Sequence, residues 1–313
     1  MKLLPISALA ISATILAGSA FAGQSFDASK GGKKTVIEPC PPTSRLLLDI
    51  DSSFVFESDF KSRSHPNAKG EAYSGSVELG YRIPLGEGWP NERCGTWNLR
   101  FGARYARHDF DNSGGLPLPN HIQTLAGVIA LEYVVSNETA ILLETRPGVY
   151  FENDIAGRNF DSPTTLGFAF RLSDNFVGVL GASYGGFRPF PVIPGIGFKW
   201  TISDRMTLTA IFPKASFDYK FSDSCGAYLG AEYVGDSVRV DRQPGRPDKL
   251  GHAALTYSEY RAGLGVRFKL GAISGEIGGG YAFQRKFDYH RADLAWETED
   301  GAPYIKAELH AAF

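Results

Sequence analysis

The sequence predicts an all-β chain: a transmembrane, antiparallel, up-and-down β-barrel of 14 strands, with 12 as the alternative count. The first supporting observation is residues 73–85, YSGSVELGYRIPL, which alternate without exception between an apolar row and a polar or small row. The second is that similar runs recur along the chain. The third is that short turns and long loops alternate between these runs, which is typical of barrels that span an outer membrane.

Composition supports many short strands rather than a helical bundle. The 313 residues include 36 Gly, 14 Tyr and 22 Phe, but only 2 Met and 3 Cys. A mean hydropathy of -0.15 does not argue against a membrane, because alternation hides the lipid-facing row from any average. Lys and Arg (32) nearly balance Asp and Glu (34), so we expect no nucleic acid partner.

The first residues have the pattern of a secretory signal. Lys2 precedes an apolar run over residues 3–17, and Ala20-Phe21-Ala22 precede Gly23, which predicts a signal peptide over residues 1–22. Residues 23–44 are polar and aperiodic, and we interpret them as a periplasmic lead-in to a barrel over residues 45–313. No later apolar run reaches the roughly 18 residues of a membrane helix, so a membrane-spanning mature chain has to form a closed barrel.

Fourteen alternating runs follow one another. Between them, an apolar residue followed by Ser-Asp or Ser-Asn recurs at Val135, Leu172, Ile202 and Phe221, and these residue types suit tight corners. Long loops beginning at residues 59, 109, 153, 241 and 291 all fall at the opposite end, which we expect to be extracellular, with both termini periplasmic. The predicted strands cover residues 46–56, 73–85, 97–105, 125–135, 141–151, 166–172, 176–184, 196–202, 206–212, 217–221, 227–235, 258–270, 277–289 and 305–313.

Charged residues recur on the row that faces inward. A water-filled pore for small solutes explains them, and weak ion selectivity then follows because both signs are present. The alternative is a lumen closed by ion pairs, in a structural or adhesive barrel. The predicted pore lining consists of Asp49, Asp51, Glu78, Arg82, Arg100, Arg104, Glu132, Glu144, Arg146, Arg171, Lys199, Asp218, Lys220, Glu232, Glu259, Arg261, Arg267, Lys269, Lys306 and Glu308.

No motif indicates an enzyme. Five histidines (65, 108, 121, 252 and 290) fall in the external loops or upper strand ends, where a hydrolase acting at the extracellular rim could use them, but their spacing matches no catalytic or metal-binding pattern. We therefore expect no catalytic residue, no metal and no cofactor. Cys40, Cys94 and Cys225 fall at the periplasmic end, an oxidising compartment, and a disulfide between Cys40 and Cys94 would tie the lead-in to the first turn.

Two segments resemble known families. The alternating strand over residues 304–313, ending in Phe313 behind a cleavable signal, resembles the sorting signal of bacterial outer-membrane barrel proteins. That resemblance implies a Gram-negative outer membrane as location, with membrane lipid, lipopolysaccharide and the barrel-assembly machinery as partners. Residues 194–200 (PGIGFKW), followed by 208–213 (LTAIFP) and Tyr219, resemble an uncharacterised outer-membrane barrel family labelled as a domain of unknown function, most clearly over residues 191–233. This second resemblance implies fold and location but no activity.

Overall fold

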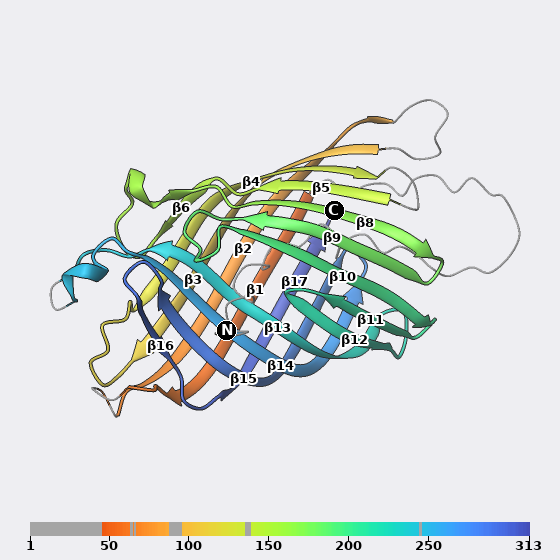
Figure 1. Ribbon diagram of the computed structural model, residues 1–313. Coiled ribbons are helices and arrows are strands. Elements are labelled where there is room, and N and C mark those ends of the chain that lie inside the picture. Colours follow the sequence, from red (N-terminus) through yellow and green to blue (C-terminus); the bar gives the residue numbers. More distant parts are fainter. Residues whose placement is uncertain (1–45, 63–64, 66, 88–95, 135–138, 244–245) are drawn as a thin grey trace, which may run out of the picture.

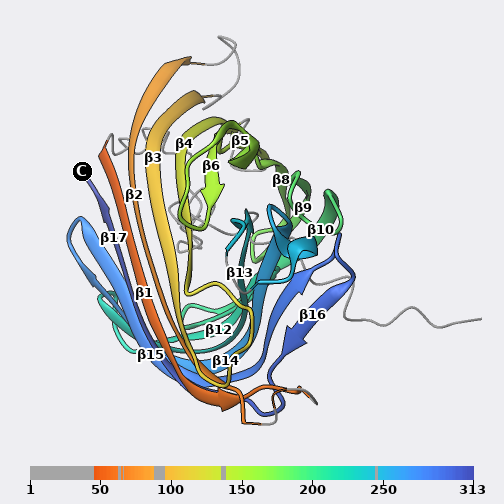
Figure 2. The ribbon, with the colours of Figure 1, turned by 90° about the vertical axis from the view of Figure 1, so that its left-hand side faces the viewer.

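The computed structural model describes residues 46–62, 65, 67–87, 96–134, 139–243 and 246–313, and shows a closed antiparallel barrel. Fourteen strands formed by these residues pair in sequence order, and β17 pairs back onto β1 from Leu47↔Ala312 to Val55↔Tyr304. The predicted fold class and the count of 14 are therefore confirmed. Figure 1 shows the tilted strands of this ring, and Figure 2 places β1–β3 and β8–β10 on opposite sides.

The ring strands run β1 to β5, β8 to β15 and β17, and three short strands (β6, β7 and β16) extend the wall at one end. In chain order the elements are β1 (Leu46–Asp59), β2 (Lys69–Glu87), β3 (Thr96–Asn112), β4 (His121–Val134), β5 (Thr139–Thr145), β6 (Gly148–Phe151), η2 (Gly157–Asn159), β7 (Phe160–Asp161), β8 (Thr164–Ser173), β9 (Phe176–Tyr184), β10 (Val192–Ser203), β11 (Met206–Ile211), β12 (Lys214–Lys220), β13 (Cys225–Arg239), η3 (Asp248–Leu250), β14 (Ala254–Leu270), β15 (Ile273–Tyr289), β16 (Leu294–Glu297) and β17 (Ala302–Ala312).

The outer surface of the ring is apolar. In β2, Tyr73, Val77 and Leu79 are exposed, whereas Ser74 and Glu78 between them are buried in the interior. This is the reverse of a soluble protein, and it is the arrangement that a strand surrounded by lipid requires. The described part of the chain contains no helix long and apolar enough to cross a membrane.

The two sides of the barrel differ in height. β2 has 19 residues and β3, β14 and β15 have 17 each, whereas β11 has 6 and β12 has 7. The long strands extend past the alternating runs that predicted them: β2 begins at Lys69 rather than at residue 73, and β3 continues to Asn112 through a segment expected to be a loop. Alternation fails to mark these ends because their outward residues are polar.

At the long-loop end, β6 leaves the ring order and connects β4 with β13 directly. After β5, the chain bends at Arg146-Pro147, and β6 pairs with β4 on one side and with the two-residue β7 on the other. Phe151 then pairs with Arg239 of β13, although β13 lies seven strands from β4 in the ring. The predicted loop over residues 153–163 therefore contains η2 and β7, and the predicted loop after residue 291 contains β16.

Candidate functional site: the barrel lumen

The strand register turns every residue of the predicted lining toward the lumen. Cross-strand partners place charged side chains in rows on the inner face, for example Asp49 opposite Glu78, and Glu78 opposite Arg104. The strand register shows only which way these side chains point. Conduction along this lining stays a prediction. The lining residues nearest the short-turn end are Arg171, Lys199, Lys220 and Lys269, on β8, β10, β12 and β14.

One ion-pair network surrounds Arg100 on β3. Its Nη1 donates to Glu78 Oε1 at 2.7 Å, its Nη2 donates to Glu144, and its Nε lies 3.6 Å from Glu132. Arg146 Nε donates to Glu144 Oε1 at 2.8 Å, and its Nη2 lies 3.3 Å from Glu78. Arg100, Glu78 and Glu144 are buried, so each charge depends on the others for the solvation that water would supply.

A second network surrounds Lys306 on β17. Lys306 Nζ lies 2.8 Å from Glu232, 2.9 Å from Glu276 and 3.2 Å from Glu308. Lys214 Nζ, from β12, contacts Glu276 at 2.9 Å and Glu308 at 2.7 Å. The contacts of Lys306 with Glu232 and of Lys214 with Glu276 and Glu308 connect strands that are not neighbours in the ring, so they cross part of the lumen. The network also includes Asp218, Glu259, Arg261 and Arg267.

Water reaches part of this charged lumen. The inward side chains of Arg104, Lys214, Glu308 and Arg267 keep 28%, 30%, 31% and 34% of their exposure. On β17, His310 Nδ1 lies 2.5 Å from Asp49 Oδ1, and both side chains are partly exposed as well. These side chains are therefore accessible to solvent, whereas Arg100, Glu144 and Lys306 at the centres of the two networks are buried.

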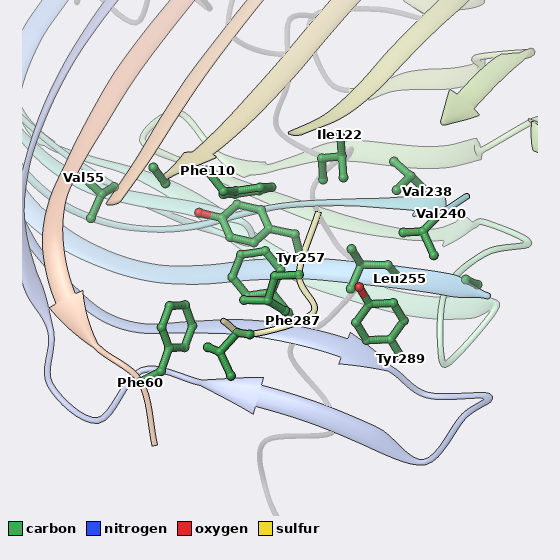
Figure 3. Close-up of a cluster of buried hydrophobic side chains, with 14 of the residues drawn as sticks. Val55, Phe60, Phe110, Ile122, Val238, Val240, Leu255, Tyr257, Phe287 and Tyr289 are labelled. Carbon is green, nitrogen blue, oxygen red and sulfur yellow. The ribbon is translucent and has the colours of Figure 1, made fainter. Parts of the chain in front are cut away.

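The long-loop end is dry. Buried apolar side chains from β1, β3, β13, β14 and β15 meet inside the barrel, as Figure 3 shows. The ring of Phe110 lies 4.7 Å from that of Tyr257 and 4.8 Å from that of Phe287, measured between centroids, and Tyr257 and Phe287 are fully buried. Phe110 is on β3 and Tyr257 on β14, so this aromatic cluster spans the lumen. Sequence reasoning missed it, because it treated the inward row as uniformly polar.

Polar contacts also cross the lumen beside the aromatic cluster. Thr124 Oγ1 on β4 donates to Asp236 Oδ2 on β13 at 3.1 Å. His108 is hydrogen-bonded to Ser74 at 2.7 Å, and its Nε2 lies 4.0 Å from Asp236. His108, which was expected in an external loop or at an upper strand end, lies in the upper part of β3, and its side chain is buried inside the barrel with its ring 5.4 Å from that of Tyr257. It therefore lies away from the outer rim, where the hydrolase hypothesis needs its histidines.

A clasp joins the loop after β6 to the loop after β13. Glu152 accepts hydrogen bonds from the backbone N–H of Asp241 at 2.8 Å, from Gln243 Nε2 at 2.9 Å, and from both Nη atoms of Arg246 at 2.7 and 2.8 Å. Asp241 Oδ2 in turn accepts from the backbone N–H groups of residues 153 and 154. Burial alone would lower the pKa of Arg246, but Glu152 outweighs it and raises the pKa of the guanidinium. No motif in the sequence marks this clasp.

The other predicted sites are the three cysteines and the C-terminal residue Phe313. Cys40 and Cys94 lie outside the described residues, so the disulfide between them stays a prediction; the signal peptide and the lead-in lie outside them too. Cys225 is exposed, and among the described residues it is a free thiol. Phe313 is exposed, and its backbone exchanges two hydrogen bonds with Leu46; its sorting role stays a prediction.

A closed ring, an apolar outer belt and a charged lumen define the class of this protein: it is a transmembrane β-barrel of the outer-membrane type. The chain belongs to the family Domain of unknown function (DUF6268), which matches residues 44–297 and confirms the expected family. No curated protein matches the chain.

Three solved structures are similar in outline. An outer membrane channel from Pseudomonas putida F1 has 10% identity and a TM-score of 0.45, covering 90% of this chain and 100% of the other. A deletion mutant of the TodX monoaromatic hydrocarbon channel has 11% identity and a TM-score of 0.39, covering 88% and 91%. LpxR from Salmonella typhimurium has 10% identity and a TM-score of 0.38, covering 85% and 100%. Likeness this distant carries no conclusion about activity.

Proposed function

We propose that this protein is a bacterial outer-membrane channel that lets small solutes cross passively, with weak ion selectivity and no catalytic role. Its long loops face outward and its termini face the periplasm. The observation that supports passage is the partly exposed, charged inner face: Arg104, Lys214, Glu308 and Arg267 point inward and keep about a third of their exposure.

Weak selectivity follows from the pairing of charge along the inner face. The network around Arg100 contains four arginines and three glutamates, and the network around Lys306 contains four cations and five carboxylates, counted over described residues in ion pairs. An ion in the lumen therefore meets both signs at close range. Neither cations nor anions gain a large advantage.

The dry long-loop end favours a second candidate, a closed structural barrel. Tyr257 and Phe287 are fully buried at the point where β3 and β14 face each other, and the clasp at Glu152 holds the loops above them. In the channel proposal this end is a gate that opens when the loops separate. In the structural proposal it never opens.

Planar bilayer recordings test the proposal. We expect discrete conductance steps that become more frequent in Glu152→Gln, because this variant weakens the clasp. A reversal potential close to zero across a salt gradient is expected for weak selectivity. Silence of both proteins, while heat-modifiable gel mobility shows a folded barrel, would leave the closed structural barrel as the function.

A further inference from the structure

The three lysines of the lining that lie nearest the short turns have no carboxylate partner. Lys199 on β10, Lys220 on β12 and Lys269 on β14 form no ion pair with any residue that the structure describes. By contrast, Lys214, at the opposite end of β12, contacts two carboxylates, and Lys306 on β17 contacts three. We name the three unpaired side chains the mouth lysines, because they lie at the short-turn end of the lumen.

The strand register brings the mouth lysines into one region of the inner face. Lys220 of β12 and Arg267 of β14 are both paired with Gly226 of β13, so no side chain separates them. Lys199 lies close enough to these two cations for their charges to repel its own. Lys269 is the next inward residue after Arg267 on β14. Positive charge is therefore concentrated at this end.

The carboxylates around the mouth lysines are engaged elsewhere or lie outside the lumen. Asp218 and Glu276 both form ion pairs with Arg267. Three further aspartates lie at the tips of the short turns, where they are exposed to bulk water and form no ion pair with a described residue: Asp174, Asp204 and Asp223. The mouth lysines are thus left without a counter-charge inside the described part of the barrel.

Unpaired cations inside a barrel of low-dielectric wall attract anions. The wall focuses their field into the water of the lumen and raises the local concentration of counter-ions. Rings of Lys or Arg serve this purpose in pores for anions and phosphate, and each ammonium group offers three hydrogen-bond donors. Lys220 and Lys269 are exposed and Lys199 is half-buried, so their ammonium groups are open to a solute. An anion with two or more charges can contact more than one of them.

We propose that the mouth lysines bind small multivalent oxyanions, such as phosphates and dicarboxylates, at the short-turn end of the lumen. The proposal rests on the proposed channel function for passage and names the class of solute that the channel carries. Selectivity between simple ions stays weak, because the two paired networks further along the lumen carry both signs. The mouth lysines add a small preference for anions.

Calorimetric titration of inorganic pyrophosphate into the protein in phosphatidylcholine nanodiscs tests the proposal. We expect saturable binding at low salt, and an affinity about tenfold lower in the double variant Lys199→Gln, Lys220→Gln, which loses two exposed charge contacts. Lys199→Arg should retain the affinity, because it retains the charge. The matched control is Lys249→Gln, which removes an exposed lysine at the long-loop end and should leave the affinity unchanged.

The outcomes separate the anion site from the channel function. Pyrophosphate binding by a barrel that conducts no current in planar bilayers would remove the channel function and leave the site. Absence of binding, or an equal loss of affinity in Lys249→Gln, would overturn the site whether or not the barrel conducts. Loss of binding in nanodiscs that contain phosphatidylglycerol would also overturn it, because the lysines would then hold lipid headgroups.

A milder variant covers the case in which the double variant does not fold, as judged by heat-modifiable mobility. Lys269→Gln changes one exposed side chain next to the end of its strand. A smaller loss of pyrophosphate affinity is expected from it, and an unchanged affinity overturns the proposal.

Discussion

The clasp at Glu152 gives the sharpest quantitative prediction. Glu152→Gln removes the carboxylate but keeps a similar shape, so the guanidinium of Arg246, whose side chain is 4% exposed, remains buried without its ion-pair partner. Breaking a buried pair from one side costs about 3–5 kcal/mol. At about 1.4 kcal/mol for each tenfold change, the lower value predicts roughly a 100-fold larger population of the opened loop.

Limited proteolysis measures that population. Trypsin cleaves after Arg242 in the clasp loop, and when opening is fast the rate of cleavage follows the open fraction. The control is Asp248→Asn, which breaks the exposed ion pair with Arg242 in the same loop and should change the rate little, because exposed pairs contribute about 0–1 kcal/mol. Equal cleavage rates in Glu152→Gln and Asp248→Asn would refute the idea that this buried pair holds the loops closed.

Three further predictions concern the wall and lumen. Arg100→Met should lower barrel stability by about 3–5 kcal/mol in urea unfolding from vesicles, because Glu78 and Glu144 lose one of the two cations that they share, and only Arg146 remains; an unchanged midpoint would contradict the buried network. Gly148→Ala should destabilise the β4–β6 pairing, since a Cβ there would lie 2.4 Å from the carbonyl oxygen of Leu125. The check is faster hydrogen exchange in β6, and wild-type protection would count against it. In single-channel recordings, a cation-to-anion permeability ratio above about ten would contradict the mixed-sign lining.

Strict alternation allowed the wall to be predicted from the sequence. Residues such as Tyr73 and Leu79 face lipid in the structure because a one-residue shift would turn every side chain of the strand to the wrong side. The same parity turned Glu78 and Arg100 inward. Which charges would pair could not be predicted, because Lys214 meets Glu276 only after strands that are distant in sequence close into a ring.

Features above the belt escaped prediction for a different reason. Phe110 and Phe187 were assigned to loops, because Gly, Pro and Asp around them mask any period, yet both are buried in the aromatic cluster. The bend at Arg146-Pro147 that redirects β6 toward β13 likewise leaves no mark in an alternating pattern. Alternation of apolar and polar residues marks a strand that has lipid on one side. It does not mark strands such as β6 that turn away from the lipid-facing wall.

The closure of the ring has a consequence for folding. Backbone hydrogen bonds join Leu46 to Phe313, so the final seam unites the two most distant parts of the described chain. Loop-closure entropy makes such a seam slow to form, and until it forms both flanking strands expose unpaired amides that hydrocarbon cannot solvate. Insertion and zipping of the last strand onto the first must therefore be concerted, or a helper must shield the open edges meanwhile.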